Sequence, residues 1–356
     1  MNIDYIVLPD LDSRGNTEII GYLDKVLNHN VTPKVWDWEF NTIRNTIFTV
    51  AKSDADIAGT QSMLPIVLRI DNKVVETAKS ETSYLDANYR GKQIFEKLYQ
   101  LAVDETVKSG SRVIWGFTPA LKAWKKNLGF ETFDSEMRIA RFDVKYFSFL
   151  KNYKNSRNIL FAAGKYCLMN LKTLRGNLLL SKLKLDNSIE VSTQLKDNND
   201  LAALYSEINT ANKELIHLDM NPQYLKWRLQ NNPAMEYRYL YFYKLGKLAG
   251  YVIYTIKHHI LSLTDITCNG DEAVLRHMLK YVVTHNDGFY AVQYWGNISN
   301  DMNQNIFNLF QGMKGKVQID NARNFVYKVF NPEYTGVTAK LKNWYINGLW
   351  TEGFHI

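Results

Sequence analysis

Hydrophobic and polar positions in the first 144 residues form runs that predict short strands alternating with helices. The predicted strands show apolar, β-branched runs, and the predicted helices show apolar residues three and four positions apart. Strands are predicted at Tyr5–Leu8, Ile47–Ala51, Gln61–Ile70, Lys73–Leu85, around Ile114, at Glu131–Phe133 and at Met137–Val144, and helices at Thr17–Leu27, Gly91–Ser109 and around Ala123. This order predicts an α/β domain of the α+β kind, with three layers around a mixed, twisted sheet.

The most informative stretch is Ser83–Lys97, where a strand pattern changes into a helix pattern. The turn between them places Arg90, Gly91 and Lys92 close to the start of the helix. Backbone N–H groups at a helix start are unpaired, and the helix dipole is positive there. The turn is therefore a candidate seat for a phosphate group.

The stretch after this helix adds a second feature. A buried-looking strand at Arg112–Gly116 is followed by a helix that ends in N-L-G-F at Asn127–Phe130. Together the features resemble the GNAT superfamily of N-acetyltransferases. In that family a strand runs into an R-G-x-G-x-G/A turn that cradles the coenzyme A pyrophosphate, and a later helix ends in a similar L-G-F signature. The resemblance covers about Asn2–Arg141.

The resemblance implies acetyl-CoA as co-substrate, bound by the end of the strand and by the turn. The implied cofactor-binding residues are Ser83, Tyr84, Leu85, Arg90, Gly91, Lys92, Gln93, Ile94, Phe95 and Trp124. The sequence departs from the family at Gln93 and Phe95, where small residues are preferred, and at Trp124, where many members have a tyrosine. An indole N–H cannot protonate a departing thiolate as a tyrosine can.

Acyl transfer to an amine also needs a base for the ammonium proton. On the strand before the turn, Glu76 and Glu81 are the carboxylates that can serve as catalytic base, directly or through water. An exposed strand glutamate without a catalytic role is the alternative for each. The histidines and the two cysteines lack metal-ligand spacing, so no metal site is predicted.

The chain as a whole has 356 residues, which favours two domains. Only Cys167 and Cys268 are cysteines, and they lie far apart, so a reducing cytoplasm is expected. The amino-terminal residues lack the pattern of a signal peptide, and no apolar run has the length of a membrane span. These observations predict a soluble, cytoplasmic protein of unknown oligomeric state.

The formal charge of +7 is concentrated in one segment. Lys145–Lys184 contains nine Lys and Arg and no Asp or Glu, and it reads as a mainly helical linker in which Gly164 and Gly176 are expected to interrupt the helix. One interpretation is an inter-domain connector with solvated cations. The other is an amphipathic surface for anionic lipid headgroups. No nucleic-acid-binding motif accompanies the charge.

The second half of the chain resembles the first in the order of its motifs. Trp38 precedes Gly59 of I-A-G by 21 residues, and Trp227 precedes Gly250 of L-A-G by 23 residues. V-I-W-G, which ends at Gly116, is echoed by V-Q-Y-W-G. The pattern predicts two tandem GNAT-like acyltransferase domains, residues 1–144 and 189–356, joined by a basic helical linker at 145–188.

The repeat allows the two turns to be compared. The turn of the second half carries Asp271 and Glu272 where the first half carries Arg90 and Lys92. Carboxylates at a helix start stabilise the helix but repel a pyrophosphate. The second domain is therefore predicted to be degenerate, without its own acetyl-CoA site.

A further resemblance concerns the second domain alone. Asn221–Arg228, Tyr237–Tyr243 and Asn343–Phe354 look like parts of GNAT-type proteins of bacterial polysaccharide gene clusters. The implied acceptor is a small-molecule amine or amino sugar, such as a sugar nucleotide.

Three functions stay open from the sequence. The first is an acyl-CoA-dependent N-acyltransferase, and the second is a non-catalytic binding or scaffold protein, favoured by Gln93 and Trp124. The third is a Fem-like aminoacyl transferase, a class that also uses twin GNAT domains but takes its acyl group from aminoacyl-tRNA.

Overall fold

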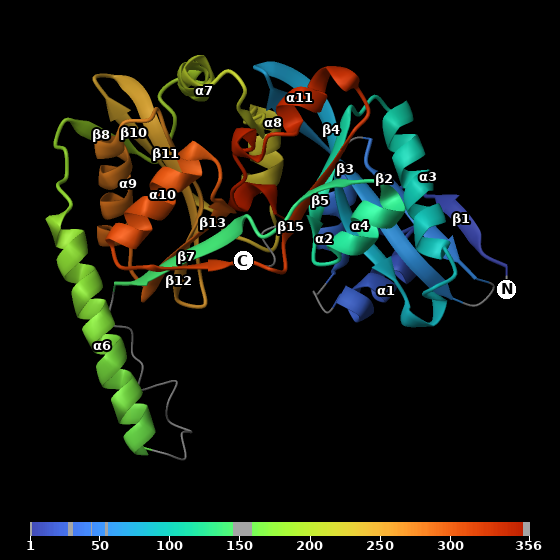
Figure 1. Ribbon diagram of the computed structural model, residues 1–356, viewed down its shortest axis with the longest axis horizontal. Helices are drawn as coiled ribbons and strands as arrows, with labels where there is room; N and C mark the ends of the chain where they lie inside the picture. Colours follow the sequence, from blue (N-terminus) through green and yellow to red (C-terminus); the bar gives the residue numbers. More distant parts are fainter. Residues whose placement is uncertain (1, 28–30, 44, 54–55, 145–158, 352–356) are drawn as a thin grey trace. The chain divides into compact units, whose positions relative to one another are not determined.

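The computed structural model describes residues 2–27, 31–43, 45–53, 56–144 and 159–351 (Figure 1). The chain forms two compact units, each assembled from three separate segments of sequence. Unit 1 consists of Met1–Ser135, Glu214–Glu236 and Asn321–Trp344, and unit 2 of Glu136–Lys213, Tyr237–Asp320 and Tyr345–Ile356. The predicted division at residues 144 and 189 concerns the repeat in the sequence and stays a prediction.

Unit 1 is built on a mixed sheet with the strand order β1-β2-β3-β4-β5-β15-β6, in which β9 also pairs with β3. Only β4 and β5 pair in parallel among these strands. The strands are β1 (Asp4–Val7), β2 (Ile47–Lys52), β3 (Ile57–Ile70), β4 (Lys73–Leu85), β5 (Val113–Thr118), β6 (Glu131–Phe133), β9 (Ile216–Leu218) and β15 (Asn324–Val329).

The helical segments of unit 1 include the three that the sequence predicts. They are α1 (Thr17–Leu27), α2 (Pro33–Trp36), η1 (Asp37–Asn41), η2 (Ala87–Tyr89), α3 (Ile94–Lys108), α4 (Leu121–Leu128), α8 (Pro222–Leu225), η3 (Lys226–Gln230), η4 (Pro332–Tyr334), α11 (Thr335–Thr338) and η5 (Leu341–Asn343). In α3 the apolar stripe of Ile94, Leu98 and Ala102 is buried as the helical spacing predicts. Gly110 follows the helix with a φ of +108°, a left-handed conformation that glycine adopts without strain.

Unit 2 is built on a second mixed sheet with the order β14-β7-β13-β12-β11-β10-β8. Here β12 and β13 form the parallel pair. The strands are β7 (Met137–Asp143), β8 (Ile189–Ser192), β10 (Arg238–Lys244), β11 (Lys247–Lys257), β12 (Ile260–Cys268), β13 (Ala291–Asn297) and β14 (Lys316–Ile319), and the helices are α6 (Ile159–Lys182), α7 (Asp200–Ala211), α9 (Glu272–Thr284), α10 (Asp301–Gly312) and η6 (Gly348–Trp350).

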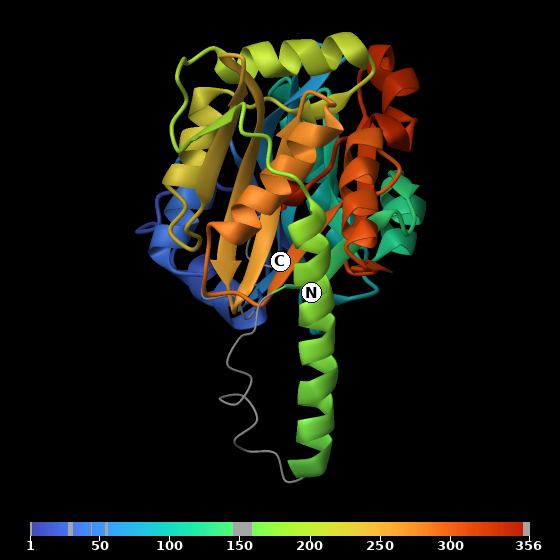
Figure 2. The same ribbon diagram turned by 90° about the vertical axis from the view of Figure 1, so that its left-hand side faces the viewer.

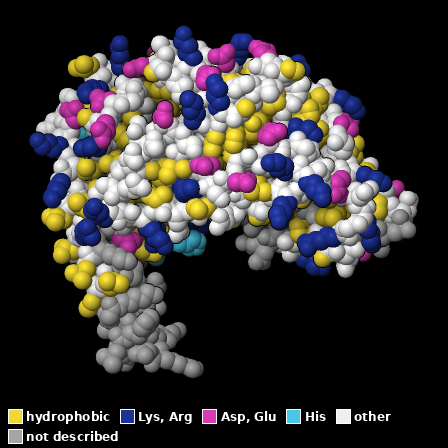
Figure 3. All heavy atoms as spheres, in the orientation of Figure 1, with side chains coloured by type: hydrophobic (Ala, Val, Ile, Leu, Met, Phe, Trp, Pro, Cys, Tyr) yellow, Lys and Arg dark blue, Asp and Glu magenta, His cyan; other side chains and the backbone are white. Residues whose placement is uncertain are grey.

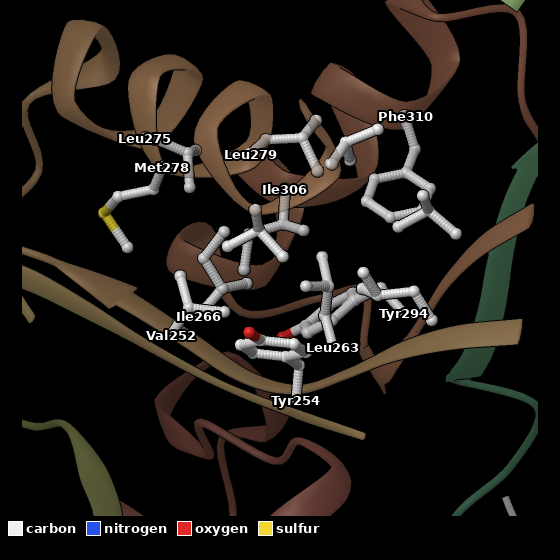
Figure 4. Close-up of a cluster of buried hydrophobic side chains, with 14 of the residues drawn as sticks. Val252, Tyr254, Leu263, Ile266, Leu275, Met278, Leu279, Tyr294, Ile306 and Phe310 are labelled. Atoms are coloured by element: carbon white, nitrogen blue, oxygen red, sulfur yellow. The ribbon is translucent and has the colours of Figure 1, made fainter. Parts of the chain in front are cut away.

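The core of unit 2 lies between this sheet and the helices α9 and α10. Figure 4 shows Leu275 and Leu279 of α9 and Ile306 of α10 pointing toward Val252 and Leu263 of the strands. All of these side chains are buried, so the sheet face and the helices hold each other through apolar packing. The mixed sheet covered by helices confirms the predicted fold class.

Each sheet contains strands from the other half of the sequence, since β9 and β15 belong to the sheet of unit 1 and β7 belongs to the sheet of unit 2. Strand β7 directly follows β6 in the chain but pairs with β13 in unit 2. Strand β15 lies near the carboxyl terminus but pairs with both β5 and β6 in unit 1 (Figure 1). The β15–β5 ladder joins residues about two hundred positions apart in the sequence, and the β7–β13 ladder joins residues about 150 positions apart.

The repeat predicted from the tryptophans also appears in the structure of unit 1. Segments α2–η1 and α8–η3 each begin with a proline after a capping Thr32 or Asn221 and continue into a π-helical turn. Trp38 and Trp227 stack with ring centroids 5.4 Å apart, and each indole Nε1–H donates to the other residue's backbone O at 2.8 Å. The two motifs are therefore related by an approximate internal symmetry.

Helix α6 corrects one expectation about the linker. It runs without interruption from Ile159 to Lys182, so Gly164 and Gly176 do not break it (Figure 2). At Gly176 a Cβ atom would lie 2.0 Å from the backbone O of Asp143, so the glycine permits close packing against β7. Residues 145–158 of the predicted linker lie outside the described residues. Within the described part of the chain, no helix combines the length and the apolar content that crossing a membrane requires.

Candidate functional site

Strand β4 contains a bulge just before its end. In the ladder with β3, Ser62 is opposite Glu81 and Thr60 is opposite Tyr84, so Thr82 and Ser83 together face one residue of β3. Thr82 has a φ of +46°, which is a strained conformation for a β-branched residue. Its hydroxyl donates to Ser62 Oγ at 2.8 Å, and its backbone O accepts from Thr60 Oγ1 at 2.9 Å. Strain of this kind, held by specific bonds, is concentrated at functional sites.

The bulge lies where β4 separates from β5. The parallel ladder runs only from Thr77 opposite Val113 to Ser80 opposite Gly116. Beyond Ser80, β4 stays attached to β3, because Asp86 N donates to Ala58 O at 2.9 Å. The edge of residues 81–85 that faces β5 is thus outside the ladder, and its backbone groups can bind an extended ligand chain.

Two polar side chains near the bulge were not singled out from the sequence. Gln61 Nε2 donates to Ser80 Oγ at 3.0 Å and to Glu81 O at 3.2 Å, and Gln61 Oε1 accepts from Ser83 Oγ at 2.5 Å. Lys79 forms an ion pair with Glu81, and the two side chains are only 6% and 14% exposed. The two-residue strand period puts Lys79 and Glu81 on one face, and this spacing was the signal that the sequence offered.

The structure separates the two predicted bases. Glu81 is adjacent to the strained Thr82, whereas Glu76 is exposed near the opposite end of β4. At about 3.3 Å per residue, Glu76 lies on the order of 15–20 Å from the bulge. Of the two, only Glu81 lies near the separation of the strands.

The turn after β4 has an unusual backbone. Gly91 and Gln93 both have left-handed φ values, +76° and +58°. Gln93 stands at the position of the second glycine of the R-G-x-G-x-G/A pattern and adopts a left-handed conformation that glycine adopts without strain. Helix α3 begins at Ile94, and the side chain of its N-cap residue Gln93 makes no capping hydrogen bond to the first N–H groups.

The side chains around this turn are basic and open to solvent. Arg90 and Lys92 are exposed, and the Lys92 ammonium donates to Asn88 O at 3.2 Å. Asp86 uses its side chain to accept from Asn88 N at 2.9 Å and so organises the turn. The result is an uncapped helix start flanked by two cations, an arrangement that suits an anion.

The remaining predicted contacts differ in their surroundings. Ser83 is exposed, Tyr84, Leu85 and Phe95 are half-buried, and Ile94 is buried. Trp124 is also buried, and its ring lies 5.0 Å from that of Tyr99 and 4.9 Å from that of Phe130. It is a core residue of unit 1, and its role in cofactor binding stays a prediction.

Unit 2 has corresponding strands, β12 and β13, but the region where they separate is different. Strand β12 has a bulge at Thr264, and its ladder with β13 runs only from Ile260 to Leu263. Residues Tyr345–Trp350, here called the C-terminal plug, lie against both strands beyond that point. Asn297 N donates to Ile346 O at 3.1 Å, and a Cβ on Gly348 would lie 2.9 Å from Thr264 O.

A buried carboxylate fixes the C-terminal plug. Asp265 accepts hydrogen bonds from the hydroxyls of Tyr251 at 2.6 Å, Thr267 at 2.8 Å and Tyr345 at 3.1 Å. Burial raises the pKa of Asp265 to about 6, although the hydroxyl donors oppose the rise. Through the Tyr345 hydroxyl, the network holds the C-terminal plug in the space where β12 and β13 separate.

The turn of unit 2 is also closed to anions. Asp271 accepts from Ala273 N at 2.8 Å and from Val274 N at 3.4 Å, so it caps α9, and it pairs with Lys244 at 2.9 Å. A cavity of about 250 Å³ beside this turn is lined by Cys268, Gly270, Glu272 and Asn305 together with apolar side chains. Its only charged lining residue is an acid. Among the described residues, no three His, Cys, Asp or Glu side chains gather as a metal site would require.

Comparisons with known proteins identify the fold. No protein-family model matches the sequence, and no curated protein does. Solved structures do match. A protein of Enterococcus faecalis described as a probable N-acyltransferase has 11% identity and a TM-score of 0.63, over 93% of this chain and 73% of that one.

Two further structures share the same architecture. A GCN5-related N-acetyltransferase from Anabaena variabilis has 15% identity and a TM-score of 0.59, over 93% of this chain and 73% of that one. A tandem GNAT protein from the clavulanic acid biosynthesis pathway has 11% identity and a TM-score of 0.58, over 93% and 99%. The GNAT resemblance predicted from the sequence is therefore confirmed at the level of the fold, and the chain has the fold of these structures.

Proposed function

We propose that unit 1 binds acyl-coenzyme A and transfers the acyl group, most simply acetyl, to the nitrogen of an amine. The observation that carries this proposal is the direct succession of the strained bulge, the separation of β4 from β5 and the uncapped basic turn. The pyrophosphate would lie at Arg90–Phe95, and the pantetheine chain along the free edge of Ser83–Leu85. The fold of tandem GNAT neighbours supports this placement.

The chemistry assigns one role to Glu81 and no obligatory role to Trp124. The amine nitrogen attacks the thioester carbon, the carbon–sulfur bond breaks, and Glu81 takes the ammonium proton directly or through a water. A free thiol has a pKa of about 8.5, so coenzyme A can leave as the thiolate. The reaction therefore does not require a tyrosine at position 124.

The proposal also names the class of molecule that accepts the acyl group. We place a small-molecule amine or an amino sugar, such as a sugar nucleotide of surface polysaccharide synthesis, at the acyl end of the site. The resemblance of Asn221–Arg228 to proteins of polysaccharide gene clusters supports this choice. The cytoplasm is the proposed location, and both cysteines are free thiols as a reducing compartment allows.

A non-catalytic binding protein is the second candidate. Gln93 and Phe95 occupy positions where the family has small residues, so side chains larger than the family's stand beside the proposed phosphate seat. Such a protein would bind coenzyme A and would not release it from acetyl-CoA at any acceptor concentration. The binding and transfer experiments below therefore distinguish the two functions.

The first experiment is isothermal titration of acetyl-CoA and free coenzyme A into the wild type and the Arg90→Ala/Lys92→Ala variant. We expect micromolar binding that weakens about tenfold or more in the variant, a loss of about 1.4 kcal/mol or more. Lys125→Ala/Lys126→Ala, which removes two exposed cations of α4, is the matched control and should bind as the wild type does. No binding to the folded wild type would exclude the proposal.

A further inference from the structure

Helix α6 of unit 2 has two opposite faces of different character. One face is packed, since Thr173 and Leu180 are buried and Gly176 touches β7. The opposite face carries four leucines at helical spacing, which we call the leucine stripe. Its members are Leu168 (55% exposed), Leu171 (64%), Leu174 (57%) and Leu178 (60%).

An exposed stripe of four leucines is not explained by the packing of unit 2. Single exposed leucines are common, but a contiguous apolar row on a helix marks an interaction surface. Figure 3 shows hydrophobic side chains on the described part of α6, with Lys and Arg side chains near them. The remaining question is which partner covers the row.

Cations of α6 lie beside the leucine stripe, and further cations line a cavity between α6 and strands β7 and β14. Arg175 and Lys182 of α6 are exposed. At 100° per residue, they lie on the same side of the helix as the leucine stripe. A cavity of about 470 Å³ beside α6 is lined by Arg141, Arg175, Lys314 and Lys316, with Asp143 as its only acid. Among the described residues, Arg175, Lys314 and Lys316 take part in no ion pair.

The charge decides between the occupants of this surface. A second copy of α6 would bring another helix without any Asp or Glu, so like charges would meet along the stripe. An anionic lipid surface instead offers apolar chains for leucines and phosphates for cations. Because the exposed leucines occupy one face of α6 and cations lie beside them, the helix would lie along the surface.

We propose that α6 docks unit 2 on an anionic phospholipid surface. The leucine stripe enters the headgroup–acyl boundary, and the cavity of Arg141, Arg175, Lys314 and Lys316 receives headgroup phosphate. The residues of this surface are not those of the proposed coenzyme A site, so the proposal does not rest on acyl transfer. It deepens the lipid interpretation of the basic segment by naming the residues that make the contact.

The test is flotation of the full chain with vesicles of equal parts phosphatidylcholine and phosphatidylglycerol, compared with vesicles of phosphatidylcholine alone. We expect binding to the anionic vesicles only, weakened strongly as salt approaches about 1 M, where the Debye length falls to about 3 Å. Leu171→Gln/Leu174→Gln should weaken it about tenfold or more. Leu245→Gln, at a leucine 90% exposed on the β10–β11 turn, is the matched control.

A charge pair of variants tests the second half of the proposal. Arg175→Glu/Lys316→Glu should weaken vesicle binding about tenfold or more, whereas Lys213→Glu/Lys247→Glu, also exposed in unit 2, should change it little. All substituted side chains are exposed, so unchanged thermal unfolding is expected and checks the fold. Equal binding to neutral vesicles, or no binding to either kind, would overturn the proposal.

The single exposed thiol gives a direct readout. Cys167 is exposed beside Leu168, whereas burial raises the pKa of Cys268 to about 11 and keeps it in the unreactive thiol form. A polarity-sensitive fluorophore on Cys167 should shift to the blue when anionic vesicles are added. Sedimentation analysis covers the remaining occupant: a dimer that Leu171→Gln/Leu174→Gln dissociates would show that a second copy covers the stripe, and would overturn the lipid proposal.

Discussion

The strand–turn–helix segments β4–α3 and β12–α9 have the same order of elements, but their turns and strand ends carry different side chains and contacts. In unit 1 the helix begins uncapped after a turn with Arg90 and Lys92, and β4 separates from β5 at a strained bulge. In unit 2 Asp271 caps the helix, and the C-terminal plug occupies the separation of the strands. The fold alone therefore does not make a site.

The difference shows which features a coenzyme A site would need beyond the fold. Both bulges interrupt a ladder, but only Thr82 has a positive φ. In unit 2 the side chain of Asp271 accepts from the first N–H groups of α9 and so stabilises the helix. In unit 1 the N-cap side chain of α3 accepts from no N–H group. A tandem pair can hold one open site and use the other copy as a stable support.

The largest expected effect is a difference in kcat between variants of the two carboxylates near the bulges, Glu81 and Asp265. Glu81→Gln should lower kcat about a hundredfold to ten thousandfold, or about 3–5 kcal/mol, because it removes the proposed base. Asp265→Asn should leave kcat within about twofold, since Asp265 only holds the C-terminal plug. Release of coenzyme A, followed with a thiol reagent, measures both. Equal losses in the two variants would show that the comparison assigns the roles wrongly.

The second prediction concerns the pH dependence of stability. The folded pKa of Asp265 is about 6 and its ordinary value is 3.8, so the folded state holds a proton that the unfolded state loses between these values. Its contribution is therefore full below about pH 4 and falls as the pH rises to about 6, by up to about 3 kcal/mol. Denaturant unfolding of Asp265→Asn should lack this fall. Parallel pH profiles of the two proteins would contradict the assignment.

The third prediction compares the helix starts. Asp271→Ala should lower the free energy of unfolding by about 1 kcal/mol, since α9 loses its cap and Lys244 loses a partner. Gln93→Ala should change it by much less, because the side chain of Gln93 caps nothing. Urea unfolding of the full chain measures both variants. A loss at Gln93 as large as that at Asp271 would mean that the α3 start is capped after all.

The smallest expected effect is a pair of changes in stability that have opposite signs. Gln93→Gly should stabilise the protein by a few tenths of a kcal/mol to about 1, because glycine adopts a positive φ without strain. Gly270→Gln, at a φ of +91° in the other turn, should destabilise it by a similar or larger amount. Thermal unfolding gives the signs. Two shifts in the same direction would remove backbone strain as a difference between the turns.

Local patterns in the sequence were enough for the strands and helices of the first 144 residues and for the charge of the turn. The spacing of Ile94, Leu98 and Ala102 identified α3, and Arg90 and Lys92 needed only their position beside it. The bulge at Thr82 was not predictable, because a β-branched residue with a positive φ contradicts its own backbone preference. Here the surrounding bonds decide the conformation.

Long-range features escaped the sequence for another reason. The alternating pattern of Met137–Asp143 identifies a strand but does not say which strand it pairs with. The same holds for the C-terminal plug, whose buried Tyr345 and Trp350 look like ordinary apolar residues. Gly176 resembled a helix breaker because only the packed partner explains it.

The exchange of β7 and β15 has a consequence for how the protein is made. On the ribosome, β5 leaves the exit tunnel about two hundred residues before β15, its antiparallel partner, has been synthesised. During that interval β5 presents an unpaired edge that invites aggregation. A fragment ending at residue 144 would lack β15 permanently and is expected to be insoluble, whereas the full chain should reach its native state in one late, concerted step that a chaperone can protect.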